Sequence, residues 1–219
     1  MGSGGSAVTA AVGAMATVDN KPAVPAARNP APRILPRNSL IHDQFNLYVL
    51  PVLGLMALLG VLGLVDGMKT TAVFTLYILV DIAWLLLQPD AVPAMPHVII
   101  FHHLIVLVLL AYPMRYPHFA IFCNWDGLVE INTFFLIAKR QVKDWRWLYT
   151  PLFWISFFPT RFLIHPYLVL KFWQVTESCS LWERLLVTAA QLCLCGFNVL
   201  FLQRAIPRDI KQKLRVYLG

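Results

Sequence analysis

Charged residues are scarce in this chain of 219 residues, at 13% against roughly 25% in soluble domains. Apolar residues make up 58%, against roughly 45–50% in soluble proteins. This composition excludes a conventional soluble enzyme, because a folded soluble domain needs a more polar surface. It also excludes an intrinsically disordered chain, which needs low hydrophobicity. The sequence therefore predicts a protein that lies largely in lipid.

Patterns that hold metals or disulfides are also lacking. The four cysteines form no C-x-x-C pair, which excludes a disulfide scaffold, and Cys123, Cys193 and Cys195 lie in apolar runs as small hydrophobic residues do. His97 and His102 are five positions apart, and the chain has no H-x-x-x-H motif. We therefore expect no metal site and no resident cofactor.

The first 40 residues lack a long apolar run, which argues against a secretory signal peptide. Gly, Ala, Pro and Val predominate, with scattered charges. This composition predicts a disordered N-terminal arm over residues 1–40, followed by one transmembrane domain over residues 41–215. An organelle transit peptide is the alternative, because the arm is rich in Ala and carries Arg28, Arg33 and Arg37.

Apolar runs follow one another from Phe45 onward, and each approaches the roughly 20 residues that a helix needs to cross a bilayer. They predict an all-α membrane protein with a bundle of six transmembrane helices. The expected spans are 45–65, 71–87, 97–112, 117–138, 147–170 (interrupted by Pro159) and 181–203.

Lys and Arg are unevenly distributed between the loops that these spans leave. The N-terminal arm, the loop around Lys139 to Arg146 and the C-terminal tail carry most of the 18 Lys and Arg, and all three fall on one side of the membrane. Cytoplasmic loops of membrane proteins show this excess, so both termini are expected in the cytoplasm. The net charge of +7 is thereby explained without a nucleic-acid partner.

Several ionisable side chains lie inside the expected spans, where each costs at least roughly 2.5–3.5 kcal/mol. At about 1.5 Å of rise per residue, most of them fall in the cytoplasmic half of the bundle. We expect a buried polar pocket there, with Asp81, Glu130 and one histidine of the pair lining it and Asn198 at its edge. The polar residues are Asp81, His102, His103, Asp126, Glu130, Arg161 and Asn198.

These residues admit a functional and a structural interpretation. His102 and His103 lie about 100° apart on a helix, so one can face the pocket while the other faces a neighbouring helix. A buried histidine can accept a proton or act as a nucleophile. Asp126 and Glu130 are four residues apart on one helix face, where they can orient a base or pair with Arg161. Interhelical hydrogen bonding alone is the alternative, above all for Asp81 and Arg161.

Two segments carry a recognisable combination of these residues. The first is FHHLIVLVLLAY at 101–112, with the histidine pair, and the second is NWDGLVEINTFF at 124–135, with the acidic pair. Further agreement comes from YILVD with Asp81, FWISFFPTRF with Arg161 and FNVLF with Asn198. Over about residues 45–214, these motifs resemble the TLC-domain family of multi-pass lipid proteins, which includes the ceramide synthases and smaller TLC-domain-containing proteins.

The resemblance implies a function in lipid chemistry, in the endoplasmic reticulum. In ceramide synthases, the residues that match His102, His103, Asp126 and Glu130 belong to the active site for acyl transfer from acyl-CoA to a sphingoid amine. That motif has a His-Asp dipeptide where this chain has Phe122 and Cys123. The chain is thus closer to the smaller family members, which are implicated in membrane lipid composition.

Three functions follow as hypotheses. The first is a protein of lipid homeostasis that binds or processes an acyl-chain or sphingoid-type lipid in its polar pocket. The second is an acyl-CoA-dependent N- or O-acyltransferase, with the CoA head group near Lys139, Arg140 and Lys143. The third is a trafficking adaptor without catalysis, whose polar residues only hold helices together.

Overall fold

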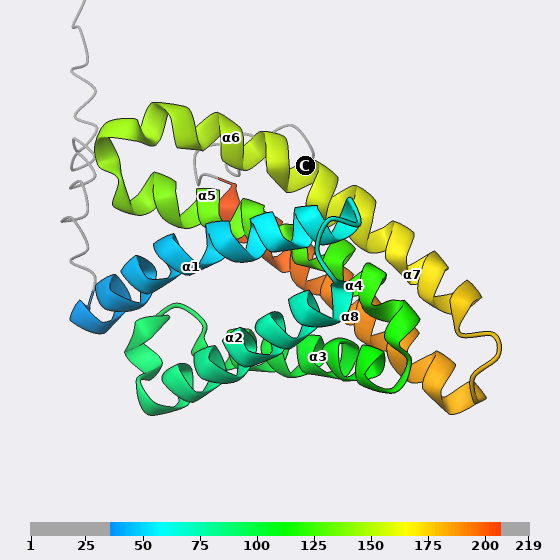
Figure 1. Ribbon diagram of the computed structural model, residues 1–219. Helices are drawn as coiled ribbons and strands as arrows, with labels where there is room; N and C mark the ends of the chain where they lie inside the picture. The colour runs from blue at the N-terminus through cyan, green and yellow to red at the C-terminus, as the bar shows by residue number, and fades with distance from the viewer. Residues whose placement is uncertain (1–35, 207–219) are drawn as a thin grey trace, which may run out of the picture. The chain divides into compact units, whose positions relative to one another are not determined.

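The computed structural model describes residues 36–206, and in this range all regular structure is helical. The expected N-terminal arm, apart from its last residues, and the basic C-terminal tail lie outside the described residues. Figure 1 shows the helices running back and forth along a common direction, as an antiparallel bundle. The elements are α1 (Arg37–Val61), α2 (Gly67–Leu87), η1 (Pro89–Ala91), α3 (Pro96–Arg115), η2 (Pro117–Phe119), α4 (Ala120–Gly127), α5 (Val129–Gln141), η3 (Lys143–Trp145), α6 (Arg146–Phe158), η4 (Pro159–Ile164), α7 (His165–Val175) and α8 (Leu181–Ala205).

Five helical segments of the described chain are long and apolar enough to cross a membrane. They are α1, α2, α3, the segment Pro117–Gln141 that contains η2, α4 and α5, and α8, each 20 to 25 residues long. These lengths match a hydrocarbon core of roughly 30 Å. The chain therefore has the helices of an integral, multi-pass membrane protein.

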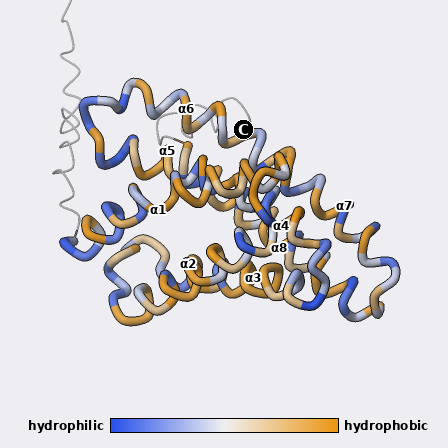
Figure 2. Tube along the Cα trace, viewed as in Figure 1, coloured by the Kyte–Doolittle hydropathy of each residue, from blue (hydrophilic) through white to orange (hydrophobic). Residues whose placement is uncertain are grey.

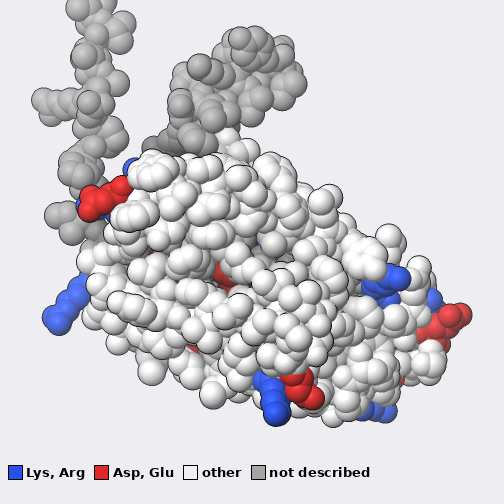
Figure 3. Space-filling view, turned by 45° about the horizontal axis from the view of Figure 1, so that its top comes forward, with Lys and Arg blue, Asp and Glu red and all other residues white. Residues whose placement is uncertain are grey.

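The outer surface of the bundle agrees with a lipid environment. Large apolar side chains such as Leu87, Leu163 and Ile155 are 82%, 67% and 69% exposed, which a water-soluble surface avoids in such number. Apolar residues run along the helices in Figure 2, whereas hydrophilic residues gather where α1 begins and where α5 turns into α6. Figure 3 shows Lys, Arg, Asp and Glu at the ends and along the lower edge of the visible face, with a largely uncharged surface between them that includes a small acidic area.

Local sequence signals set several helix ends. The Asp66 side chain caps α2 by accepting a hydrogen bond from the Lys69 amide at 2.9 Å. Ser180 and Glu183 form a reciprocal capping box at the start of α8. Gly63 follows α1 with φ of +72°, a conformation that favours glycine, and so turns the chain toward α2. Short loops of this kind keep neighbouring helices antiparallel.

The first helix begins at Arg37, eight residues before the expected start at Phe45. The sequence prediction relied on apolar runs, and the first turns of α1 are polar. Ser39, His42 and Asp43 are nevertheless buried against other helices. Polar side chains that are buried against other helices do not raise the hydropathy of a segment. The sequence therefore predicted the start of this helix too late.

Pro159 does not end its helix, because α6, η4 and α7 follow one another without a break over 146–175. The segment η4 is a π-helix, the form in which chains accommodate a local disruption of the hydrogen-bond ladder. Proline has no amide hydrogen to donate. The Thr160 hydroxyl donates to the Ser156 carbonyl at 2.8 Å, which supports the backbone at this position.

Two clusters of buried apolar residues form the core. One lies mainly between α1, α2 and the α4–α5 segment, with Leu50, Leu53 and Phe74. The other lies between α3, α7 and α8, with Leu168 and Val187 at its centre. The polar side chains described next lie between and beside these clusters.

Candidate functional site

A small cavity lies inside the bundle, between the two halves of the core. Its volume is about 40 Å³, enough for roughly three water molecules at about 10–15 Å³ each. Side chains from six helices contribute to its wall. They are Phe74, Ile78, His102, Val106, Leu109, Leu110, Cys123, Asp126, Gly127, Val129, Glu130, His165 and Leu194.

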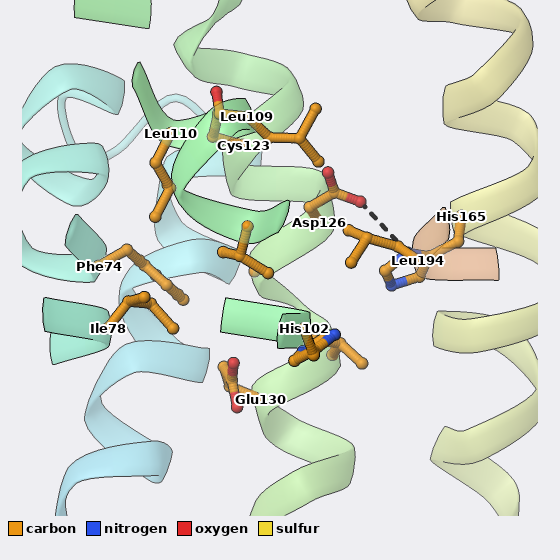
Figure 4. A pocket seen from close by; sticks show the side chains of 13 residues that line it. Phe74, Ile78, His102, Leu109, Leu110, Cys123, Asp126, Glu130, His165 and Leu194 are labelled. Atoms are coloured by element: carbon orange, nitrogen blue, oxygen red, sulfur yellow. Dashed lines mark hydrogen bonds and ion pairs between the residues drawn. The ribbon is translucent and has the colours of Figure 1, made fainter. Parts of the chain in front are cut away.

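The wall of the cavity has an apolar and a polar part. Figure 4 shows Phe74, Ile78 and Leu110 on the left of the cavity, and Asp126 and His165 on its other side. Glu130 lies about 16 Å along α5 from the end of that helix at Gln141. The polar part therefore lies near the middle of the segment Pro117–Gln141, which is long and apolar enough to cross a membrane.

Asp126 holds one side of the polar wall together. Its Oδ1 accepts a hydrogen bond from Gln191 Nε2 at 2.9 Å and lies 3.5 Å from His165 Nδ1. Its Oδ2 is buried without a hydrogen-bond partner, as is His165 Nε2. The side chain of Asp126 is 15% exposed. Two buried polar atoms of this wall thus have no hydrogen-bond partner.

His102 and His103 face in different directions, as their 100° separation predicts. The His102 ring lines the cavity and packs edge-on against Phe197 and Phe201, with ring centroids 5.1 and 5.9 Å apart. Its Nδ1 is buried without a hydrogen-bond partner. His103 instead points toward α2, where its Nδ1 lies 3.3 Å from Asp81 Oδ2.

Asp81 is the centre of a second polar group, which we call the Asp81 cluster: His42, Asn46, Tyr77, Asp81 and His103. His42 Nε2 lies 2.7 Å from Asp81 Oδ1, and Asn46 Nδ2 lies 3.3 Å from His42 Nδ1. The Tyr77 hydroxyl donates to Asn46 Oδ1 at 2.9 Å. This cluster joins α1, α2 and α3, and Asp81 is 2% exposed.

Arg161 is the centre of a third group, the Arg161 cluster. Its guanidinium donates to Asn132 Oδ1 at 2.8 Å, to Asn198 Oδ1 at 2.9 Å and to Thr133 Oγ1 at 3.2 Å. These bonds tie the π-helix η4 to α5 and α8. Glu130 is the nearby acidic group that interacts with Arg161 electrostatically. The cluster therefore places a buried positive charge beside the acidic wall of the cavity.

Only some of the residues that we expected to line one pocket line the cavity of the structure. His102, Glu130 and Asp126 line the cavity, but Asp81 and His103 form their own cluster, and Asn198 binds Arg161 instead of lying at the cavity edge. The physical reason is direction: these residues lie at similar depths, yet they project from different sides of their helices. The expectation that Asp81 lines the cavity is therefore corrected.

Sequence reasoning missed three residues that matter to these groups. His165 and Gln191 lie inside expected spans, so the criterion of polar residues within a span could have found them. His42 lies before the expected start of the first span, where hydropathy gave no signal. Asp43, close to it, pairs with Arg140 and also accepts a hydrogen bond from Gln141.

Within residues 36–206, no three His, Cys, Asp or Glu side chains are grouped so that they could hold a metal ion. Comparison of the chain with models of protein families, with curated proteins and with solved structures gave no match. The arguments for function therefore come from the chemistry of the cavity and the two clusters.

Proposed function

We propose that this protein acts in membrane lipid homeostasis by holding an acyl-chain or sphingoid-type lipid with its head group in the cavity. One observation carries the proposal: Asp126, His102 and His165 line a cavity among helices that are long enough to span a membrane, and each has a buried polar atom without a partner. Such groups are costly in lipid and mark functional sites unless they satisfy one another. These three atoms do not.

The volume of the cavity limits the mode of binding. Pockets for complete small ligands measure roughly 300–1,000 Å³, whereas this cavity measures about 40 Å³. It accommodates a head group of a few atoms, with the hydrocarbon chain between or beside the helices.

The membrane arrangement is part of the same proposal. The continuous helix over 146–175 would be the sixth span, which places both termini on one side of the membrane. The excess of Lys and Arg makes that side the cytoplasm. Membership of the TLC-domain family and residence in the endoplasmic reticulum remain proposals that rest on the resemblance of the motifs.

An acyl-CoA-dependent acyltransferase is the second candidate. It is favoured by two imidazoles that line the cavity, His102 and His165, each with one nitrogen without a partner, because a base or nucleophile would act there. The expected CoA site is weaker: Arg140 pairs with Asp43, and Lys139 Nζ lies 3.5 Å from the centre of the Phe153 ring. Lys143 is the exposed basic residue that remains of the three.

Photo-crosslinking tests the first proposal. The purified protein in lipid nanodiscs is exposed to a photoreactive, clickable C18 lipid, and the labelled fraction is measured. We expect Asp126→Asn combined with Glu130→Gln to reduce labelling about tenfold or more, since two charge-assisted contacts are lost. Asp144→Asn is the matched control, because Asp144 is exposed in η3. Equal labelling of all three proteins would show that the cavity is not the binding site.

The same preparation separates the alternatives. An acyltransferase would consume acyl-CoA in the presence of a long-chain amine or alcohol, and His102→Ala would abolish this turnover without changing the folded fraction. An adaptor would show neither turnover nor cavity-dependent labelling. Lipid labelling without turnover is the result that the first proposal predicts.

A further inference from the structure

His165 is the one imidazole of the cavity that the motifs did not indicate. It is the first residue of α7, directly after the π-helix, and it is 3% exposed. Figure 4 shows its ring beside Asp126 at one side of the cavity, with the ion pair drawn between them. The residue thus joins the polar wall from a helix that carries neither the histidine pair nor the acidic pair.

The contacts of the ring indicate which nitrogen carries the proton. Nδ1 lies 3.5 Å from Asp126 Oδ1 and 3.4 Å from Gln191 Nε2. A carboxylate can only accept, so we assign the proton to Nδ1. Gln191 Nε2 donates to the same carboxylate oxygen at 2.9 Å and lies 3.4 Å from the His165 carbonyl oxygen, so its two hydrogens have acceptors without the ring. Nε2 of His165 then keeps a lone pair.

The free atoms on this wall are therefore acceptors. His165 Nε2 and Asp126 Oδ2 are buried and have no partner, and the Glu130 carboxylate lines the same cavity. A buried acceptor without a donor is destabilising, so a bound donor gains affinity here. A phosphate or a carboxylate would instead meet these acceptors, because the Arg161 guanidinium beside the wall already donates to Asn132, Asn198 and Thr133.

We propose that His165 determines head-group specificity: its Nε2, together with Asp126 Oδ2, accepts hydrogen bonds from a hydroxyl or ammonium group of the bound lipid. Asp126 and Gln191 position the ring, and anionic head groups are excluded from the cavity. This inference rests on the proposed function, since it concerns the lipid that the cavity holds. It adds a residue and a head-group chemistry that the histidine pair does not supply.

Competition among compounds with one hydrocarbon chain tests the inference. A photoreactive, clickable C18 alcohol is the probe, and oleyl alcohol, oleylamine, oleate and methyl oleate are the competitors. We expect the alcohol or the amine to compete at concentrations about tenfold or more below those of oleate and methyl oleate, the effect of one or two hydrogen bonds. Whichever of the two competes better identifies the donor as a hydroxyl or an ammonium.

His165→Asn is the diagnostic variant, because asparagine keeps a donor for Asp126 but has no equivalent of Nε2. We expect the preference for donors to fall to about threefold or less. His118→Asn is the matched control, since His118 is exposed in η2, and it should keep the full preference. Asp126→Asn is a second variant, in which an amide supplies a donor at the wall, so methyl oleate should gain relative to oleyl alcohol.

The outcomes distinguish this inference from the proposed function. If all four compounds compete equally in the unmodified protein, or if His165→Asn and Asp126→Asn both keep the original preference, His165 does not determine specificity, although a lipid still binds. If no compound reduces labelling at any concentration, the proposed function itself fails.

Discussion

Replacing Arg161 should lower the free energy of unfolding by an amount that can be calculated from its hydrogen bonds. Arg161→Met removes three hydrogen bonds, to Asn132, Thr133 and Asn198, and leaves two amide oxygens buried without these donors. Interhelical hydrogen bonds in membrane proteins contribute about 0.6 kcal/mol each on average and up to about 1.7 kcal/mol. The loss is therefore about 2 kcal/mol, with an upper bound near 5 kcal/mol if each bond has the maximal value.

A lysine at this position retains the positive charge but not the planar fork of donors. Arg161→Lys should therefore cost about half as much as Arg161→Met. The free energy of unfolding is measured in mixed micelles by adding a denaturing detergent and following far-UV circular dichroism. Arg204→Met is the control, because Arg204 is exposed near the end of α8, and it should change stability by less than about 0.5 kcal/mol.

A double-mutant cycle with Asn132→Leu isolates the contact between Arg161 and Asn132. The two substitutions together should cost about 0.6 kcal/mol less than the sum of the single costs. If Arg161→Met is as stable as the unmodified protein to within about 0.5 kcal/mol, the guanidinium does not hold α5, η4 and α8 together, and the reasoning is refuted.

Two further predictions concern packing and topology. Gly60→Ala places a Cβ against the side-chain amide of Asn124 and should cost about 1–3 kcal/mol in the same assay. Gly196→Ala meets no atom within 4 Å and should be neutral or stabilising. Equal effects of the two substitutions would refute the close contact of α1 with α4. In a chain without its native cysteines, Ser3→Cys and Ser178→Cys should react with a membrane-impermeant maleimide from opposite sides of the membrane, and labelling from one side would exclude six spans.

The helices were largely predictable from the sequence because burial in lipid leaves long apolar runs. The expected span 117–138 corresponds to the segment Pro117–Gln141, and the expected span 181–203 corresponds to α8 at Leu181–Ala205. The start of α1 was not predictable in this way, because its first turns bury polar residues that hydropathy cannot distinguish from a loop.

The candidate site was predictable in its composition but not in its grouping. The number of residues from a helix end gives the depth of a side chain in the membrane, and by this measure we expected Asp81 near the histidine pair. Which side chains meet depends also on the rotation of each helix, and rotation is set by packing between helices that a single sequence does not show. His103 thus meets Asp81, whereas His102 and Glu130 meet at the cavity. His165 was missed because no motif surrounds it.

The position of the crosslink in the labelled protein tests the central claim most directly. Peptide mapping by mass spectrometry after labelling with the C18 probe identifies the attached residues. If a lipid head group occupies the cavity, the modified residues lie in the segments 120–130 and 165–168, and Asp126→Asn with Glu130→Gln removes these sites. Attachment confined to lipid-facing residues such as Leu87 and Leu163, unchanged in that variant, would contradict the account.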